Sequence, residues 1–386
     1  MESANAAARS RYEELDSLRG AAAMMVVLNH FFLASYSTGG IEDYVRLLAD
    51  PLQNGPLAVV LFFLLSGFVL SIPVWREKPQ NYRVFIMRRV CRIYIPYLFA
   101  LALSVLACAF FVNRPVQGLS DWFYKTWTGP VQWALVLKHI LFIGPSYNVR
   151  EFNTAFWTLI IEMRVSIIFP FFLLLMRRLS LSGCLILCLV CQIIGSVAET
   201  HCPPLQIIGW TSFFIAGAIV AREVNRAHSR LAGFFSRRLT ALFCIALFLF
   251  ANHLTKGLWG WESVARGLSI AGALGMICAA VYNRDLRILL QTRVLLFFGR
   301  ISYSLYLLHA TVLYITLHLF YGALSKPLLF LLYLAASTIA AALSYSFIEV
   351  PALELGRRLT SSRRREPRVA TSKPLSHDSS ANASTA

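Results

Sequence analysis

An arginine and a histidine near the N-terminus have the types and the spacing of a ligand-binding or catalytic pair. Arg19 and His30 are eleven residues apart in the largely apolar stretch LDSLRGAAAMMVVLNH. On a helix, eleven residues return to within about 20° of the starting direction, so both side chains share a face about 16 Å apart along the axis. Asp16 precedes Arg19 by three residues, where its carboxylate can orient the guanidinium. Ionisable groups in apolar segments indicate functional sites.

Glu162 is a possible partner for His30. It follows Trp157 by five residues, which places it about 8–10 Å below one membrane interface. His30, about 17–20 Å from the other interface, reaches a similar depth. A neighbouring carboxylate fixes the tautomer of an imidazole and makes it a better base. A purely structural contact between two helices is the alternative, and the spacing leaves both open.

Arg88, Arg89 and Arg92 fall on one side of a helical continuation that leads into a later apolar run. They are expected at the cytosolic surface. There they either anchor the chain against anionic lipids or clamp the phosphates of a cytosolic anionic ligand.

The stretch FFGRISYSLYLLH carries a further set of polar groups. Arg300 is expected at the cytosolic edge of the membrane, and Ser302 and His309, seven residues apart, share a helix face. His309 is expected near the middle of the bilayer, whereas His318 lies closer to the opposite end.

The elements that position these groups are predicted to be membrane-spanning helices. Of 386 residues, 57% are hydrophobic and 14% are charged, against about 25% charged in soluble domains. Several apolar runs exceed the roughly 18 residues that a spanning helix needs. The chain is therefore predicted to be an all-α polytopic membrane protein with ten spans, at about 18–36, 55–73, 93–112, 155–176, 180–198, 205–221, 239–255, 264–282, 295–320 and 327–348.

The distribution of basic residues supports ten spans with both termini cytosolic. Alternate connections and the two termini hold 25 of the 36 Lys and Arg residues, and the remaining connections hold seven. This is the positive-inside pattern. It accounts for the net charge of +17 without a nucleic-acid partner. Residues 14–356 are predicted to form one membrane domain, 1–13 a polar N-terminus and 357–386 a disordered basic tail rich in Ser, Arg and Pro.

The predicted exterior connection 113–154 is longer than the topology requires and rich in aromatic residues. Its 131–143 part is apolar but too short to span, which predicts a re-entrant or interfacial helix. The connection is either an aromatic belt segment or a lid over an acceptor site.

The eight cysteines are mostly placed inside apolar segments. Cys188 and Cys191 form a C-x-x-C pattern, but with Cys184 they lie on one face of an apolar helix, and no second pair lies at zinc-ligand spacing. They are expected to be packing residues, and neither a disulfide framework nor a metal site is predicted.

Six short motifs, in order along residues 12–356, resemble those of the acyltransferase-3 family of integral-membrane O-acyltransferases. They are Leu15-Asp16-Ser17-Leu18-Arg19-Gly20 with Arg19…His30, Phe62-Phe63-Leu64-Leu65-Ser66-Gly67-Phe68, Arg89-Val90-Cys91-Arg92, Phe156-Trp157-Thr158-Leu159-Ile160-Ile161-Glu162, Gly299 to His309, and Phe347-Ile348-Glu349-Val350-Pro351. One departure is Met163-Arg164 after Glu162, where the family commonly has an aromatic-rich segment. This difference affects the part of the site that is expected to bind the acceptor. An arginine two residues after the glutamate resembles fungal members of the family.

The resemblance implies transfer of an acyl group, often acetyl, from cytosolic acyl-CoA to a hydroxyl of a glycan or a small molecule such as a secondary metabolite. Acyl-CoA is then a co-substrate, and no permanently bound cofactor is expected. In this interpretation Arg19, Arg89 and Arg92 are expected to hold the donor, and His30 is expected to be the general base, with Glu162 orienting it or binding the acceptor. The supporting cavity residues in this interpretation are Asp16, Ser66, Arg164, Arg300, Ser302, Tyr303, His309 and Glu349.

A proton-coupled transporter is the alternative from a different class, because buried Arg, Glu and His also form proton relays. Transporters often show internal repeats and helices broken near mid-span. The sequence shows no convincing repeat, and its conspicuous prolines lie near span ends. A membrane-bound O-acyltransferase of the other large family would not explain the spacing between Arg19 and His30.

Overall fold

The structure is a computed structural model that describes residues 12–35, 50–142, 148–226, 231–254 and 262–361. Within these ranges the regular elements are helices, and extended pairing is confined to two isolated bridges, Ser35 with Leu119 and Tyr321 with Leu324. The predicted all-α class is confirmed.

Each of the ten predicted spans corresponds to a helix. The helices are α2 (Glu13–Ala34), α4 (Gly55–Trp75), α5 (Tyr82–Phe111), α7 (Phe156–Arg178), α8 (Leu181–His201), α9 (Gln206–Val224), α11 (Arg238–Leu254), α12 (Glu262–Tyr282), α14 (Arg293–Phe320) and α15 (Lys326–Ser344). In the described part of the chain, nine helices are long and apolar enough to cross a membrane. The remaining one, α11, has 17 described residues. The shorter helices are α6 (Trp133–Leu141), α10 (Leu231–Phe235), α13 (Arg284–Leu290) and α16 (Val350–Thr360).

The helix boundaries that differ most from the predicted spans are the start of α2, at Glu13 where about 18 was predicted, the start of α5 and the end of α15. Helix α5 begins at Tyr82, ahead of the span predicted at about 93–112, and its first three turns contain Arg88, Arg89 and Arg92, in agreement with the predicted helical continuation. At the other end of the chain, α15 passes through a π-helical turn, Tyr345–Glu349, into α16, which ends at Thr360. The helix thus continues four residues past the predicted domain end at 356. It does so because α16 packs on α5, where Arg88 Nε donates to Thr360 Oγ1 at 2.8 Å. Residues 1–11 and 362–386 lie outside the described residues.

Large apolar side chains cover the outer faces of the helices. Examples are Phe171, Leu189 and Leu239, which are 59%, 59% and 81% exposed. An apolar exterior around a core that also holds buried polar groups is the arrangement that lipid favours, because the hydrocarbon solvates the outside. The chain is therefore a multi-pass integral membrane protein.

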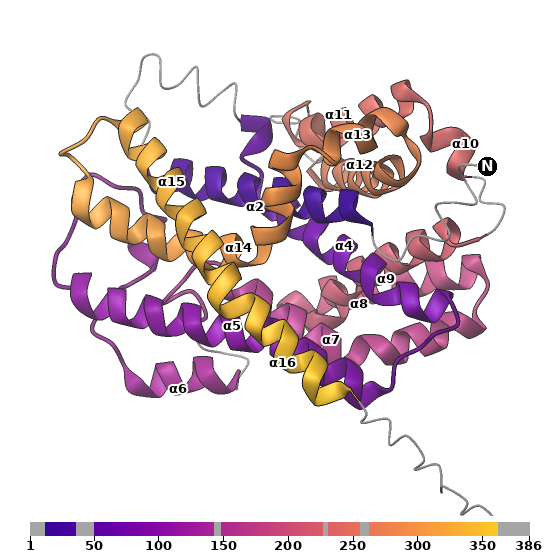
Figure 1. Cartoon of the computed structure of the whole chain (residues 1–386), viewed down its shortest axis with the longest axis horizontal. Coiled ribbons are helices and arrows are strands. Elements are labelled where there is room, and N and C mark those ends of the chain that lie inside the picture. The colour runs from indigo at the N-terminus through magenta and orange to yellow at the C-terminus, as the bar shows by residue number, and fades with distance from the viewer. Residues whose placement is uncertain (1–11, 36–49, 143–147, 227–230, 255–261, 362–386) are drawn as a thin grey trace, which may run out of the picture.

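Helices α2 and α14 lie side by side at the centre of the bundle (Figure 1) and approach at two glycines. A Cβ at Gly20 would lie 2.6 Å from the Gly299 nitrogen, and a Cβ at Gly299 would lie 2.7 Å from the Asp16 carbonyl carbon. Only glycine permits this backbone contact, the usual device of close helix pairs in membranes. Gly67 and Gly217 make the same contact between α4 and α9.

Helices α2 and α14 run in the same direction, because Gly20 pairs with Gly299 at one level and His30 with His309 ten residues further along both. Their N-terminal ends lie beside the C-terminal end of α4. This is the side that the Lys and Arg distribution assigns to the cytosol, and it is called the basic side below.

Candidate active site

Two adjacent cavities lie between α2, α4 and α14, beginning on the basic side. The larger has a volume of about 550 Å³, and its charged lining residues are Asp16, Arg19, Arg92, Arg300, Glu349, Glu354 and Arg357. The smaller, further into the bundle, has about 30 Å³, room for about one water molecule. Arg19, Ser302 and Tyr303 line both. A polar route therefore leads from a basic mouth into the helix bundle.

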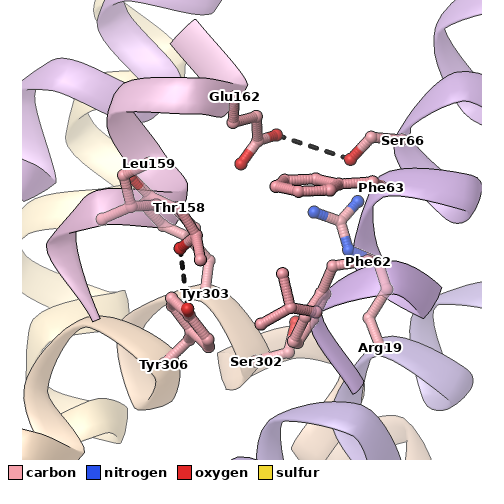
Figure 2. Close-up of a pocket in the computed structure, with 11 residues that line it drawn as sticks. Arg19, Phe62, Phe63, Ser66, Thr158, Leu159, Glu162, Ser302, Tyr303 and Tyr306 are labelled. Atoms are coloured by element: carbon pink, nitrogen blue, oxygen red, sulfur yellow. Dashed lines mark hydrogen bonds between the residues drawn. The ribbon is translucent and has the colours of Figure 1, made fainter. Parts of the chain in front are cut away.

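Arg19 and Arg92 are the cations at the inner end of the larger cavity. Both are half-buried, and neither makes a hydrogen bond or ion pair with the described residues. Figure 2 shows the Arg19 guanidinium directed into the smaller cavity. Partly buried guanidiniums with open donors are suited to a phosphate or carboxylate, which they bind through paired hydrogen bonds.

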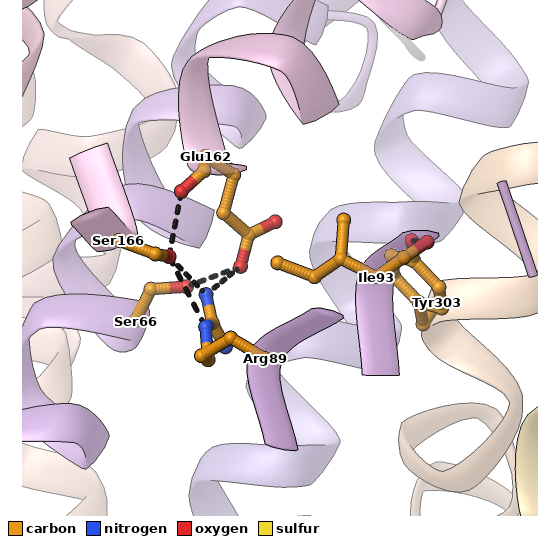
Figure 3. A network of polar contacts seen from close by, with 6 residues as sticks. All are labelled: Ser66, Arg89, Ile93, Glu162, Ser166 and Tyr303. Atoms are coloured by element: carbon orange, nitrogen blue, oxygen red, sulfur yellow. Dashed lines mark hydrogen bonds and ion pairs between the residues drawn. The ribbon is translucent and has the colours of Figure 1, made fainter. Parts of the chain in front are cut away.

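Arg89 lies in a different environment from the one predicted. Its side chain is 9% exposed, and Nη2 lies 2.8 Å from Glu162 Oε1 in an ion pair that joins α5 to α7 (Figure 3). Ser166 Oγ accepts from Arg89 Nε and Nη2 at 3.1 and 3.0 Å and donates to the Glu162 carbonyl at 2.7 Å. Arg89 points from α5 towards Glu162 of α7, and it also lines a groove of about 930 Å³ with Arg88 and Arg92.

Glu162 is consequently paired with Arg89 and not with His30. Its Oε1 also accepts a long hydrogen bond of 3.4 Å from Ser66 Oγ (Figure 2). Matched depth did place the carboxylate inside the bundle, where it lines the smaller cavity. The depth of a residue along its helix does not determine which side chain of another helix it contacts. The Arg89 guanidinium on α5 is a stronger partner for the buried Glu162 carboxylate than a neutral imidazole.

The rest of the smaller cavity combines hydroxyl groups with aromatic rings. Tyr306 Oη and Thr158 Oγ1 are hydrogen-bonded at 2.7 Å, and Tyr303 Oη donates to the Ile93 carbonyl at 2.8 Å (Figures 2 and 3). Phe62 and Phe63 form the apolar part of the wall. These bonds fix the side chains around the space of the smaller cavity.

His30 is hydrogen-bonded to His309. His30 Nδ1 lies 2.8 Å from His309 Nε2, and the two rings stack with centroids 4.9 Å apart. His309 is fully buried and His30 half-buried. The Trp122 ring, from the 113–154 connection, covers His30 with its centroid 4.9 Å away. Tyr306 links this pair to the smaller cavity, since its ring lies 5.8 Å from that of His309.

The long connection folds against the bundle and touches the histidine pair. Besides Trp122, it contributes Asn153, whose Nδ2 donates to the Leu307 carbonyl of α14 at 3.0 Å. The predicted short helix is present as α6, held to α5 by a hydrogen bond of 3.1 Å from Tyr97 Oη to the His139 carbonyl. The contacts place this connection over His30, and both the belt and the lid hypotheses stay open.

Two other predicted residues lie at the margin. Arg164 Nη2 donates to the Phe142 carbonyl at 3.2 Å, away from both cavities, and Arg300 is exposed at the mouth of the larger one. Glu349 is 4% exposed and accepts from Ser304 Oγ at 2.8 Å. It belongs to the π-helical turn Tyr345–Glu349, a feature that is frequent at functional sites.

Several residues of the site were missed in the sequence. Ser166 and Thr158 lie four residues either side of Glu162 on one helix face, so helical spacing could have found them. Trp122 could not have been found, since its contact with His30 depends on how the connection folds. In the described ranges no group of three or more His, Cys, Asp or Glu side chains could hold a metal ion.

Comparison with known proteins gives consistent matches. The model of the acyltransferase domain family matches residues 12–346. The chain is 26% identical to "Acyltransferase MdmB" of Streptomyces mycarofaciens, over 90% of this chain and 93% of that protein. It is 24% identical to "Nodulation protein 10" of Rhizobium leguminosarum bv. viciae, over 81% of this chain and 86% of that protein. No solved structure matches.

Proposed function

The chain belongs to the acyltransferase-3 family and is a membrane acyltransferase, and from this premise we propose that it transfers an acyl group, such as acetyl, from acyl-CoA to a hydroxyl group of a glycan or small molecule. His30 is the general base in this proposal. The family membership favours an enzyme over the transporter that the buried ionisable groups also suggested.

The observation that carries the proposal is the pair of guanidiniums, without a partner among the described residues, at the inner end of the basic cavity. Arg19 and Arg92 have donors available there, and the phosphates of acyl-CoA are anions of the kind they bind. Arg300 and Arg357 add positive charge at the mouth. Arg89, predicted with them, holds Glu162 instead, so its proposed role is to position the cavity wall.

The thiol arm of the donor then extends along α2 from Arg19 towards His30, a separation of about 16 Å on the helix. His30 removes the proton from the acceptor hydroxyl, whose oxygen attacks the thioester carbonyl and forms a tetrahedral intermediate. Collapse of the intermediate breaks the carbon–sulfur bond. The CoA thiolate leaves and takes the proton from the imidazolium, which restores neutral His30 and yields the ester and free CoA.

The test uses the purified full-length protein in lipid nanodiscs with radiolabelled acetyl-CoA and a metabolite extract as the source of acceptors. Wild-type protein is expected to give a labelled ester product, and the His30→Ala variant is expected to lose transfer while it binds acetyl-CoA normally. Full transfer by His30→Ala would contradict the base assignment. Binding of acetyl-CoA by neither protein would contradict the donor assignment.

A further inference from the structure

The hydrogen bonds of His30 and His309 indicate which nitrogen of each ring carries the proton. His309 Nδ1 lies 3.1 Å from the Leu305 carbonyl oxygen, four residues earlier on α14. Its other nitrogen, Nε2, lies 2.8 Å from Nδ1 of His30. Both ring nitrogens of His309 are therefore engaged, whereas among the described residues only one nitrogen of His30 is.

The chemistry of the two acceptors assigns the protons. A carbonyl oxygen only accepts, so His309 must carry its proton on Nδ1 and, as a neutral ring, presents a lone pair at Nε2. Nδ1 of His30 must then donate to that lone pair. A neutral His30 with its proton on Nδ1 has its own lone pair on Nε2, the nitrogen that the pair leaves open.

The hydrogen bond from Nδ1 to the carbonyl four residues earlier also occurs at other helical histidines of this protein. His318 Nδ1 lies 2.7 Å from the Tyr314 carbonyl, and His139 Nδ1 lies 2.9 Å from the Leu135 carbonyl. Backbone geometry thus fixes the tautomer of His309 without a carboxylate.

The packing of α2 on α14 sets the register of the two rings. The backbone contact of Gly20 with Gly299 fixes one level, and ten residues along each parallel helix rise by about 15 Å. His30 and His309 therefore arrive at the same depth.

We propose that His309 is the positioning residue of the proposed acyl transfer: it accepts the Nδ1 proton of His30 and so directs the basic Nε2 of His30 to the acceptor hydroxyl. The inference rests on the proposed function. Here a neutral imidazole, anchored to a backbone carbonyl, takes the orienting role that was one of the two predicted for Glu162. During the reaction His309 Nε2 also stabilises the imidazolium that His30 becomes.

Three substitutions of α14 test the proposal. His309→Phe keeps the ring volume and removes the acceptor, and a loss of kcat on the order of 10–100-fold is expected, as for other orienting partners, with the KM for acyl-CoA unchanged. His309→Gln places an amide oxygen near the position of Nε2 and is expected to restore most of the activity. His318→Phe is the matched control, because His318 makes the same carbonyl bond on the same helix without touching His30.

A second measurement reads the tautomer directly. Nitrogen-15 NMR of the histidine-labelled protein in nanodiscs distinguishes protonated from unprotonated ring nitrogens, with the His30→Gln variant identifying the signals of His30. Wild-type protein and His309→Gln are expected to show His30 protonated on Nδ1, and His309→Phe is expected to lose that preference.

The outcomes separate this inference from the proposed function. Wild-type His30 protonated on Nε2, or full kcat in a folded His309→Phe protein, overturns the positioning role even if His30→Ala is inactive. Retained transfer by His30→Ala overturns the base assignment itself. Thermal unfolding of each variant shows whether a loss of kcat comes from a loss of fold.

Discussion

Arg19 and Arg89 both belong to the motifs that resemble the family, but their guanidiniums lie in different environments. Both are guanidiniums drawn into the bundle, but Arg89 is neutralised by Glu162 at 2.8 Å, whereas Arg19 faces the cavity without a described partner. Breaking a buried ion pair costs about 3–5 kcal/mol because it leaves an uncompensated charge. Arg89 is therefore not available to bind a ligand, whereas Arg19 and Arg92 have donors available for an anion that enters the larger cavity.

We predict that Arg19→Gln and Arg92→Gln each raise the KM for acyl-CoA by about 10-fold or more, since a hydrogen bond to a charged group contributes about 1.5–3 kcal/mol. Steady-state kinetics with varied acyl-CoA checks this. Arg226→Gln removes the same charge from the basic side, where Arg226 pairs with Glu223 outside both cavities. It is the control and is expected to leave the KM unchanged. An equal rise in all three variants would indicate a general charge effect instead of a binding site.

At the scale of helices, the site depends on the contact of α2 with α14. The contact brings together Arg19 and Ser302 at the two cavities and, higher up, His30 and His309. The glycines at its base have no room for a side chain, since a Cβ added at Gly20 or Gly299 would lie 2.6 or 2.7 Å from backbone atoms of the other helix. A change in this contact is expected to shift every one of these groups.

We predict that Gly299→Ala destabilises the protein by about 1–3 kcal/mol, the usual cost of overpacking, and lowers kcat by displacing His309 from His30. Thermal unfolding in detergent and transfer kinetics measure the two effects. Gly267→Ala on α12 is the matched control, because an added Cβ there meets nothing within 4 Å. Wild-type stability and kcat in Gly299→Ala would show that the helix contact is more tolerant than its geometry indicates.

At the scale of the whole molecule, the larger cavity lies on one side of the membrane domain. The larger cavity has four arginines in its lining and lies on the side that holds most of the basic residues of the connections. The positive-inside rule assigns that side to the cytosol, where acyl-CoA is expected. In the proposed reaction, the acyl donor therefore enters the site from the cytosolic side.

We predict that sealed inside-out vesicles transfer label from added acyl-CoA, which does not cross membranes, and that sealed right-side-out vesicles do not. The reason is that the cavity lined by Arg19 and Arg92 lies on the basic side. Product formation is measured with limiting acceptor on both sides. Permeabilisation of the right-side-out vesicles with detergent is the control and is expected to restore transfer; transfer by both intact preparations would contradict a donor site on the basic side.

Much of the fold could be predicted because the signals are local. Hydropathy alone located the ten helices to within a few residues at most ends, and Arg19, Ser66, Glu162, Ser302 and Tyr303 were all predicted residues that line the smaller cavity. Polar groups in an apolar segment must face the interior, since lipid cannot solvate them. The helix ends farthest from the predicted span ends, at Glu13, Tyr82 and Thr360, lie outside the apolar runs. Those of α5 and α16 are supported by packing between the two helices.

For Arg19, His30, Glu162 and His309, the sequence by itself determined that the side chain enters the bundle and at what depth, because both follow from the rise of a single helix and the solvent around it. Only the tertiary structure decided which of them meet. His30 pairs with His309 and Glu162 with Arg89, although spacing had suggested His30 with Glu162. Partner choice depends on the register between helices, and that register is set by backbone contacts such as Gly20 with Gly299, which no spacing along one helix contains.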